Sequence, residues 1–187
     1  MLLFVGLGNP NPNNSTNRHN IGFLVIDAIN SKFKLSKQKP KFKGLLTTGN
    51  IDQQKVFAIK PLTFMNHSGV CIKELIEYFK ISAKDVFVFH DDMDIDIGKV
   101  KAKFGGSSAG HNGIESIDKN IGKNYSRIRI GVGRPKNNST GAEHVLDNFS
   151  SEEQQSMEEV TKNIIESLST LIKKDLDLFS NKINQSQ

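Results

Sequence analysis

Tryptophan is absent from this chain, and cysteine occurs only once, as Cys71. A single cysteine excludes an intramolecular disulfide framework and a cysteine metal cluster. Cys71 lies inside an apolar helical pattern, which favours a core position over a nucleophile. No stretch approaches the roughly 18 consecutive apolar residues of a membrane span, and the N-terminus lacks the basic region of a signal peptide. We therefore expect a cytoplasmic protein with no membrane partner.

The chain has 187 residues, which suffice for one domain with a substantial core. Hydrophobic residues make up 36% and charged residues 24%, as in folded proteins. The formal net charge of +5 favours a polyanionic partner only weakly, because many basic proteins bind nothing acidic.

Alternating strand and helix patterns predict a single α/β domain over 1–187, with a mixed, mostly parallel sheet flanked by helices. Strands are predicted at 2–8, 43–50, 54–60, 85–90, 99–104 and 126–133. Helices are predicted at 19–33, 68–80, 112–121 and from about 151 to 173 or beyond. The last helix is amphipathic and starts at a capping box, and the tail 180–187 is expected to be frayed.

The stretch 9–20 connects the first strand to the first helix and ends in Arg18, His19 and Asn20. Chemistry in α/β proteins concentrates where strands end, so this loop delivers His19 to the mouth of the sheet. Asp91 comes directly off another buried strand. A carboxylate in that place suits the orientation of a histidine.

Other motifs fail on their details. Gly6 and Gly8 invite a dinucleotide-binding interpretation, but the prolines that follow prevent an immediate helix. The glycine loop 105–110 lacks the Lys and Ser/Thr of a phosphate loop. The acidic turn 92–96 lacks the glycine and the closing glutamate of a calcium loop, so we expect it to be solvated. We predict no metal and no cofactor.

Several polar residues keep two interpretations. His67, His90 and His144 are expected to be surface or satisfied histidines, whereas His111 stands in the glycine loop, where it could contact substrate or not. Basic side chains share strand faces by period two, which suits phosphate contacts as well as a solvated face. They are Lys99, Lys101 and Lys103 on one strand, and Arg127 and Arg129 on the next.

Six motifs in order resemble those of bacterial-type peptidyl-tRNA hydrolases, and together they span the chain. They read G-L-G-N-P, R-H-N-I-G-F, T-F-M-N-x-S-G, H-D-D-x-D, G-G-x-x-x-G-H-N-G and R-I-R-I-G-V-G-R-P. The resemblance implies a monomeric, metal-free α/β hydrolase that cleaves the ester between peptide and tRNA in peptidyl-tRNAs released from ribosomes. It also implies that His19 is the catalytic base and Asp91 the carboxylate that holds it.

The resemblance further implies the substrate-binding positions. Asn9 is similar to the asparagine that separates N-blocked from free aminoacyl-tRNA, and Asn66 and Asn112 resemble substrate-binding asparagines. Phe64, which by itself reads as a core residue, resembles the residue that contacts the 3′ end of tRNA. Asn14 is a substrate-binding residue by position only, because the family has tyrosine there.

The family pattern also has glycine and threonine where this chain has Asn11 and Asn17. The spacing from Asn9 to His19 is kept, so delivery of the histidine is still expected.

The chemistry expected from these residues is general-base hydrolysis. A neutral His19 can take a proton from water, while an asparagine amide from Asn66 or Asn112 donates to the oxyanion. Two alternatives remain: a non-catalytic RNA-binding protein on the same fold, and a phosphate- or nucleotide-binding protein, whose glycine motifs fail.

Overall fold

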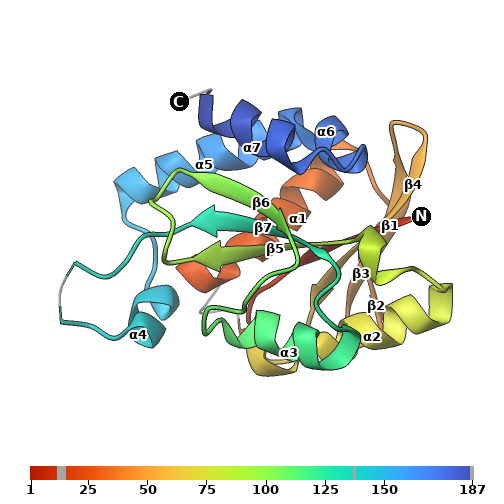
Figure 1. The fold of residues 1–187 in the computed structure, drawn as a ribbon, viewed down its shortest axis with the longest axis horizontal. Coiled ribbons are helices and arrows are strands. Elements are labelled where there is room, and N and C mark those ends of the chain that lie inside the picture. The colour runs from red at the N-terminus through yellow and green to blue at the C-terminus, as the bar shows by residue number, and fades with distance from the viewer. Residues whose placement is uncertain (12–15, 137, 186–187) are drawn as a thin grey trace.

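The computed structural model describes residues 1–11, 16–136 and 138–185. A seven-stranded sheet runs through its centre in the order β2-β3-β4-β1-β5-β7-β6 (Figure 1). The strands are β1 (Leu2–Gly6), β2 (Lys39–Lys41), β3 (Gly44–Ile51), β4 (Gln54–Pro61), β5 (Val86–Asp92), β6 (Val100–Phe104) and β7 (Ser126–Gly131). The four strands β4, β1, β5 and β7 pair in parallel, and the others join in antiparallel pairs. This confirms the predicted mixed, mostly parallel sheet.

Helices cover both faces of the sheet (Figure 1). One face packs against α1 (Ile21–Lys32), α5 (Ser151–Glu166), α6 (Leu168–Ile172) and α7 (Leu176–Gln185). The other packs against α2 (Ser68–Phe79) and α3 (Asn112–Ile121). Every residue of β1 and β5 is buried, as expected for central strands covered on both sides. No helix in the described ranges is long and apolar enough to cross a membrane.

Two short elements were not predicted. β2 lies in the lysine-rich connector, where a proline and exposed lysines are tolerated because the strand is at the edge of the sheet. α4 (Gly141–Leu146) begins at a capping box formed by Thr140 and Glu143. The predicted long C-terminal helix is interrupted at Ser167, which separates α5 from α6.

The prediction of a frayed tail is wrong for the described residues up to 185. α7 buries Phe179 and Ile183 completely. The Asn184 side chain accepts from the backbone N–H of Val100 at 3.0 Å and donates to its carbonyl at 2.9 Å. Since β6 is an edge strand, this pairing satisfies backbone groups that would otherwise face outward. The polar composition of the tail suggested fraying, but two of its polar side chains, Ser180 and Asn184, bind the backbone of β6.

Candidate active site

The carboxyl ends of β1 and β5 lie side by side, because the two strands are parallel neighbours. The chain leaves β1 and returns through a 3-10 turn, Arg18–Asn20, that leads into α1. A Cβ on Gly6 would lie 2.2 Å from the carbonyl oxygen of Gly22, so the glycines allow α1 to cross the end of β1. Gly6 therefore allows close packing of a helix on a strand. This packing places the turn that carries His19 against the end of β5.

Arg18 fixes this turn from the other side. Its Nη2 donates to Glu153 Oε2 at 2.7 Å, and its Nη1 donates to the carbonyls of His144 and Asp147. Burial opposes ionisation of Glu153, but the Ser150 N–H and the Arg18 guanidinium lower its pKa. The Arg18 side chain is only 10% exposed, so His19 is held by a buried, charged anchor.

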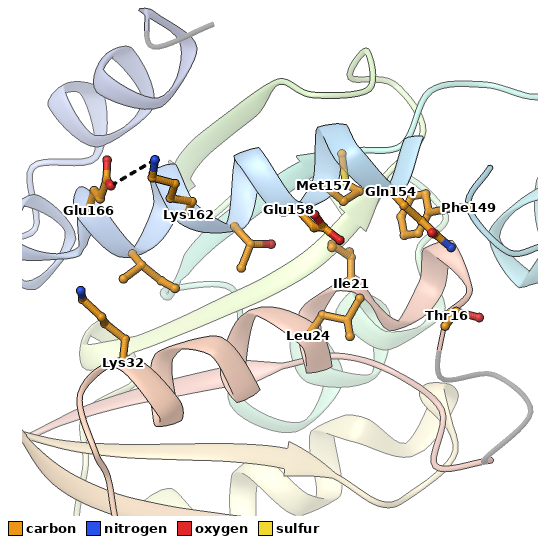
Figure 2. Close-up of a pocket in the computed structure, with 12 residues that line it drawn as sticks. Thr16, Ile21, Leu24, Lys32, Phe149, Gln154, Met157, Glu158, Lys162 and Glu166 are labelled. Carbon is orange, nitrogen blue, oxygen red and sulfur yellow. Dashed lines mark ion pairs between the residues drawn. The ribbon is translucent and has the colours of Figure 1, made fainter. Parts of the chain in front are cut away.

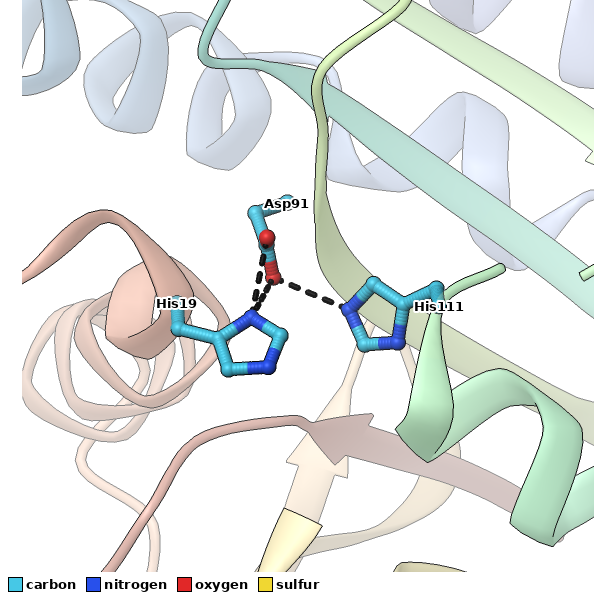
Figure 3. A group of neighbouring side chains, drawn as sticks. All are labelled: His19, Asp91 and His111. Carbon is cyan, nitrogen blue, oxygen red and sulfur yellow. Dashed lines mark hydrogen bonds and ion pairs between the residues drawn. The ribbon is translucent and has the colours of Figure 1, made fainter. Parts of the chain in front are cut away.

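Asp91 accepts hydrogen bonds from two histidines (Figure 3). His19 Nδ1 lies 2.8 and 2.9 Å from the two carboxylate oxygens, and His111 Nε2 lies 2.9 Å from Oδ1. His111 Nδ1 accepts from the backbone N–H groups of Gly113 and Ile114, so its proton sits on Nε2. The His19 proton likewise sits on Nδ1, which leaves the Nε2 lone pair available as a base.

The carboxylate of Asp91 is buried, with 2% exposure. Burial alone would raise its pKa, but His111 and His19 lower the pKa below its usual range by charge and by hydrogen bonds. Asp91 therefore remains a carboxylate, the form that can accept from both rings at once.

His90 precedes Asp91 and is also buried, and its Nδ1 donates to the Asp91 carbonyl at 2.8 Å. Its Nε2 has no partner among the described residues. Burial, helped by nearby His111, lowers the pKa of His90 to about 3. The expectation of a surface or satisfied histidine is therefore wrong for one of its two ring nitrogens.

A second set of bonds positions Asn9. The Asn20 amide accepts from the backbone N–H of Asn9 at 2.8 Å and donates to its carbonyl at 3.0 Å. Asn9 Oδ1 accepts from the backbone N–H of Met65 at 2.9 Å. The Asn9 side-chain NH₂ is thus the part left for a ligand.

These groups open onto one cavity of about 430 Å³. It is lined by the site residues predicted from sequence that the structure describes: Asn9, His19, Phe64, Asn66, Asp91 and Asn112. Phe64 is 68% exposed, so it presents a ring rather than joining the core. The side chains of Asn66 and Asn112 are exposed. Asn14 lies outside the described residues.

Some contacts of the candidate site were not predicted from the sequence. The hydrogen bond from His111 to Asp91 joins residues 20 positions apart, and the pairing of Asn20 with Asn9 joins the two ends of one loop. The available signals were the place of His111 at the start of a helix after a glycine loop and the position of Asn20 directly after His19.

Two expectations for charged residues are wrong. Arg127 does not face phosphate, because it is buried, pairs with Asp118 at 2.7 Å and donates to the Ser107 carbonyl. Asp92 is not a solvated residue of an acidic turn. It is buried and pairs with Arg129 at 2.8 Å.

His19, Asp91 and His111 are also a group that could hold a metal ion, with ligand atoms within 4.8 Å of one another. Hydrogen bonds from the two imidazoles already account for this geometry. That the site works without metal remains a prediction.

A larger hollow, of about 680 Å³, lies between α1 and α5 (Figure 2). Leu24 and Met157 line it, and Lys162 and Glu166 pair across 4.0 Å at its rim. None of the described residues predicted for the site lines it. Size alone therefore does not identify the site.

Known proteins with the same architecture are found by sequence and by structure. The family model described as peptidyl-tRNA hydrolase matches residues 3–187. A peptidyl-tRNA hydrolase from Pelagibacter ubique (strain HTCC1062) is 70% identical over 98% of this chain and 99% of its own length. One from Rickettsia prowazekii (strain Madrid E) is 46% identical over 98% of this chain and all of its own.

A crystal structure of peptidyl-tRNA hydrolase from Acinetobacter baumannii superposes with a TM-score of 0.92 at 33% identity. The superposition covers 98% of this chain and 94% of that one. With the family model matched over nearly its whole length, this chain belongs to the peptidyl-tRNA hydrolase family.

Proposed function

We propose that this chain hydrolyses the ester bond between peptide and tRNA in peptidyl-tRNAs released from ribosomes, and so recycles the tRNA. The observation that carries the proposal is the orientation of His19. His19 lines the cavity, and its Nδ1 is held by Asp91. Its Nε2 makes no hydrogen bond to a described residue. An imidazole held in this way is a general base with its basic nitrogen turned toward substrate.

The reaction needs one water molecule and no covalent intermediate. His19 Nε2 takes a proton from water as the water oxygen attacks the ester carbonyl. The carbon–oxygen bond to the ribose then breaks, and the imidazolium returns the proton to the ribose oxygen. Asp91 stabilises the imidazolium between these steps, and such general-base help contributes roughly 10²–10⁴-fold.

The asparagines bind the acyl side of the substrate. Asn66 and Asn112 line the cavity, and their side-chain NH₂ groups can donate to the developing oxyanion without adding charge. The NH₂ of Asn9 is available to a peptide carbonyl. A free amino group carries no such acceptor, which supports discrimination in favour of N-blocked substrates.

The RNA side of the substrate has its own partners. Phe64 offers an exposed ring to the 3′ end, and Lys101 and Lys103 are exposed on β6. Phosphates held by these lysines would make binding sensitive to salt. The protein acts on this substrate as a cytoplasmic monomer.

The test is to incubate the protein with N-acetyl-aminoacyl-tRNA and with unblocked aminoacyl-tRNA and to measure release of the acyl group. Cleavage of the blocked substrate alone is the expected result. A protein that binds both without cleaving either would instead be the RNA-binding alternative.

A further inference from the structure

Another hollow, of about 410 Å³, lies between α2 and α3 and adjoins the catalytic cavity. Asn66 and Asn112 line both hollows. A substrate held by these two asparagines therefore continues directly from one into the other. We call the hollow between the two helices the α2–α3 groove, and its α3 side consists of Asn112, Glu115, Ser116, Lys119 and Asn120.

The α3 side of the groove is a continuous polar stripe. Its residues recur at the spacing of one helix face, starting at the first residue of the helix. From Asn112 to Asn120 the stripe is about 12 Å long at 1.5 Å rise per residue. An extended peptide covers that length with about three to four residues.

The floor of the groove is rigid because α2 and α3 touch there. The backbone N–H of Gly69 donates to Ser116 Oγ at 3.0 Å. A Cβ at Gly69 would lie 2.2 Å from the Ser116 carbonyl oxygen, so only glycine allows this approach. A ligand in the groove therefore rests on the surface of two fixed helices.

Asn120 presents an acceptor to this surface. Its Nδ2 donates to the Ser116 carbonyl at 2.8 Å, which fixes the orientation of the amide. Its Oδ1 makes no hydrogen bond to a described residue and can accept an N–H from a ligand. Asn112 and Asn66 add further amides at the end nearest His19.

The charges around the groove do not suit RNA. Glu115 and Lys119 pair at 2.6 Å and offset each other, and none of the lining side chains is phenylalanine, tyrosine or tryptophan. On another side of the catalytic cavity, a hollow of about 140 Å³ is lined by Lys103, which is exposed on β6, and by Arg127 and Arg129, which are paired with Asp118 and Asp92. Phosphates are attracted to the exposed lysines of that side, whereas the amide-lined groove matches a peptide backbone.

We propose that the α2–α3 groove binds the peptide arm of the substrate, holding the backbone of the residues that precede the esterified one. This rests on the proposed hydrolase function. Recognition through backbone groups makes the groove indifferent to peptide sequence. Binding in the groove then depends on the length of the peptide.

The experiment compares two substrates on the same tRNA, one carrying a single N-acetylated residue and one carrying an N-acetylated peptide of about five residues, long enough to span the groove. Val70→Trp fills the groove from α2, where Val70 is half-buried and belongs to neither core cluster. Asn120→Ala removes the acceptor. Asn124→Ala, an exposed asparagine outside the groove, is the matched control.

Val70→Trp is expected to lower kcat/KM for the long substrate about tenfold, because binding energy from remote parts of the substrate is lost. Asn120→Ala is expected to lower it roughly fivefold, the loss of one hydrogen bond. The single-residue substrate should stay within about twofold, as for a surface change, and the Asn124→Ala control should change neither. Thermal melts of each variant establish that it is folded.

Equal losses on both substrates in the folded variants, or no loss on the long one, would overturn the proposal. Weaker inhibition of Val70→Trp by deacylated tRNA, with the length preference unchanged, would assign the groove to RNA instead. An acetylated five-residue peptide amide, titrated while backbone amide NMR signals are followed, tests the groove without hydrolysis. Shifts at 112–120 that vanish in Val70→Trp support the peptide site even if neither ester is cleaved, and their absence refutes it.

Discussion

The catalytic cavity at the ends of β1 and β5, or crevice, and the C-terminal layer of helices differ in the kind of side chain that they bury. The crevice buries the carboxylate of Asp91 and the imidazoles of His19 and His90 at the ends of β1 and β5, and the imidazole of His111 is half-buried beside them. The layer of α5, α6 and α7 buries mostly apolar side chains against the sheet, and its buried polar residues, Asn163, Ser167 and Thr170, are uncharged. Buried polar groups cost stability unless every one is paired. The apolar layer therefore supplies stability, which offsets the cost of burying polar groups in the crevice.

The two regions nevertheless share one device. In the crevice, the Asn20 amide pairs with both backbone groups of Asn9. In the layer, the Asn184 amide pairs with both backbone groups of Val100. The same pair of hydrogen bonds positions Asn9, the residue proposed to bind substrate, in one region and covers a sheet edge in the other. Its effect on function therefore depends on what it holds.

The largest effect should come from the crevice. His19→Ala removes the proposed base, so kcat/KM for N-acetyl-aminoacyl-tRNA should fall roughly 10²–10⁴-fold. The free energy of unfolding should fall by no more than about 1–3 kcal/mol, because the buried Asp91 carboxylate loses one of its two imidazole donors and keeps His111. Turnover assays and urea titrations of the same preparation measure both. Near-normal turnover would remove His19 from its role, and a large loss of stability would break the contrast between the regions.

The next largest effect should come from the C-terminal layer, where a substitution should lower stability and leave activity unchanged. Phe179→Ala empties a fully buried position in α7 and should destabilise the protein by about 3–5 kcal/mol. Its neighbour Leu178 is 42% exposed, so Leu178→Ala is the matched control and should cost less than about 0.5 kcal/mol. Both variants should keep kcat at a temperature where they remain folded. A lower kcat in folded Phe179→Ala would mean that the layer also shapes the crevice.

Sequence periodicity predicted most of the fold because the buried faces repeat at strand or helix spacing. It found the hairpin of β3 and β4 and the starts of α2, α3 and α5. It failed for α7, since Asn184 and Ser180 read as solvated residues when their backbone partners in β6 are unknown. Polar side chains that bind distant backbone leave no periodic signal.

Site residues could be predicted from the sequence where a single motif contains the residue. Order and spacing of motifs brought His19, Asp91 and the asparagines to one cavity. The contact between His111 and Asp91 joins two motifs through tertiary packing, so neither motif alone contains it. The burial of Arg127 likewise depends on Asp118 in α3, which sequence spacing on β7 does not reveal.

A smaller effect tests the shared asparagine device. Asn184→Ala leaves two backbone groups of Val100 without their partner and should destabilise the protein by about 1–3 kcal/mol. Asn181 is exposed on the same helix, so Asn181→Ala is the control and should be near neutral. Hydrogen exchange at the Val100 amide should accelerate only in Asn184→Ala. Unchanged protection there would mean that α7 does not close the edge of β6.

The smallest effect depends on pH and lies in the crevice. The pKa of His90 is about 3 in the folded protein, against roughly 6.5 for an unfolded histidine. Between pH 6.5 and pH 3, roughly, His90 binds a proton in the unfolded chain but not in the folded protein. The free energy of unfolding is therefore highest above about pH 6.5 and decreases as the pH falls below it. The loss reaches about 1.4 kcal/mol near pH 5.5.

His90→Asn keeps a donor near the position of Nδ1 and removes the titrating ring. The variant should therefore lose less stability than wild type between neutral pH and about pH 5.5, by that same amount. Urea titrations of both proteins across this range measure the difference. The other histidines are common to both proteins, so a pH dependence that is identical in the two would mean that His90 takes up its proton without unfolding.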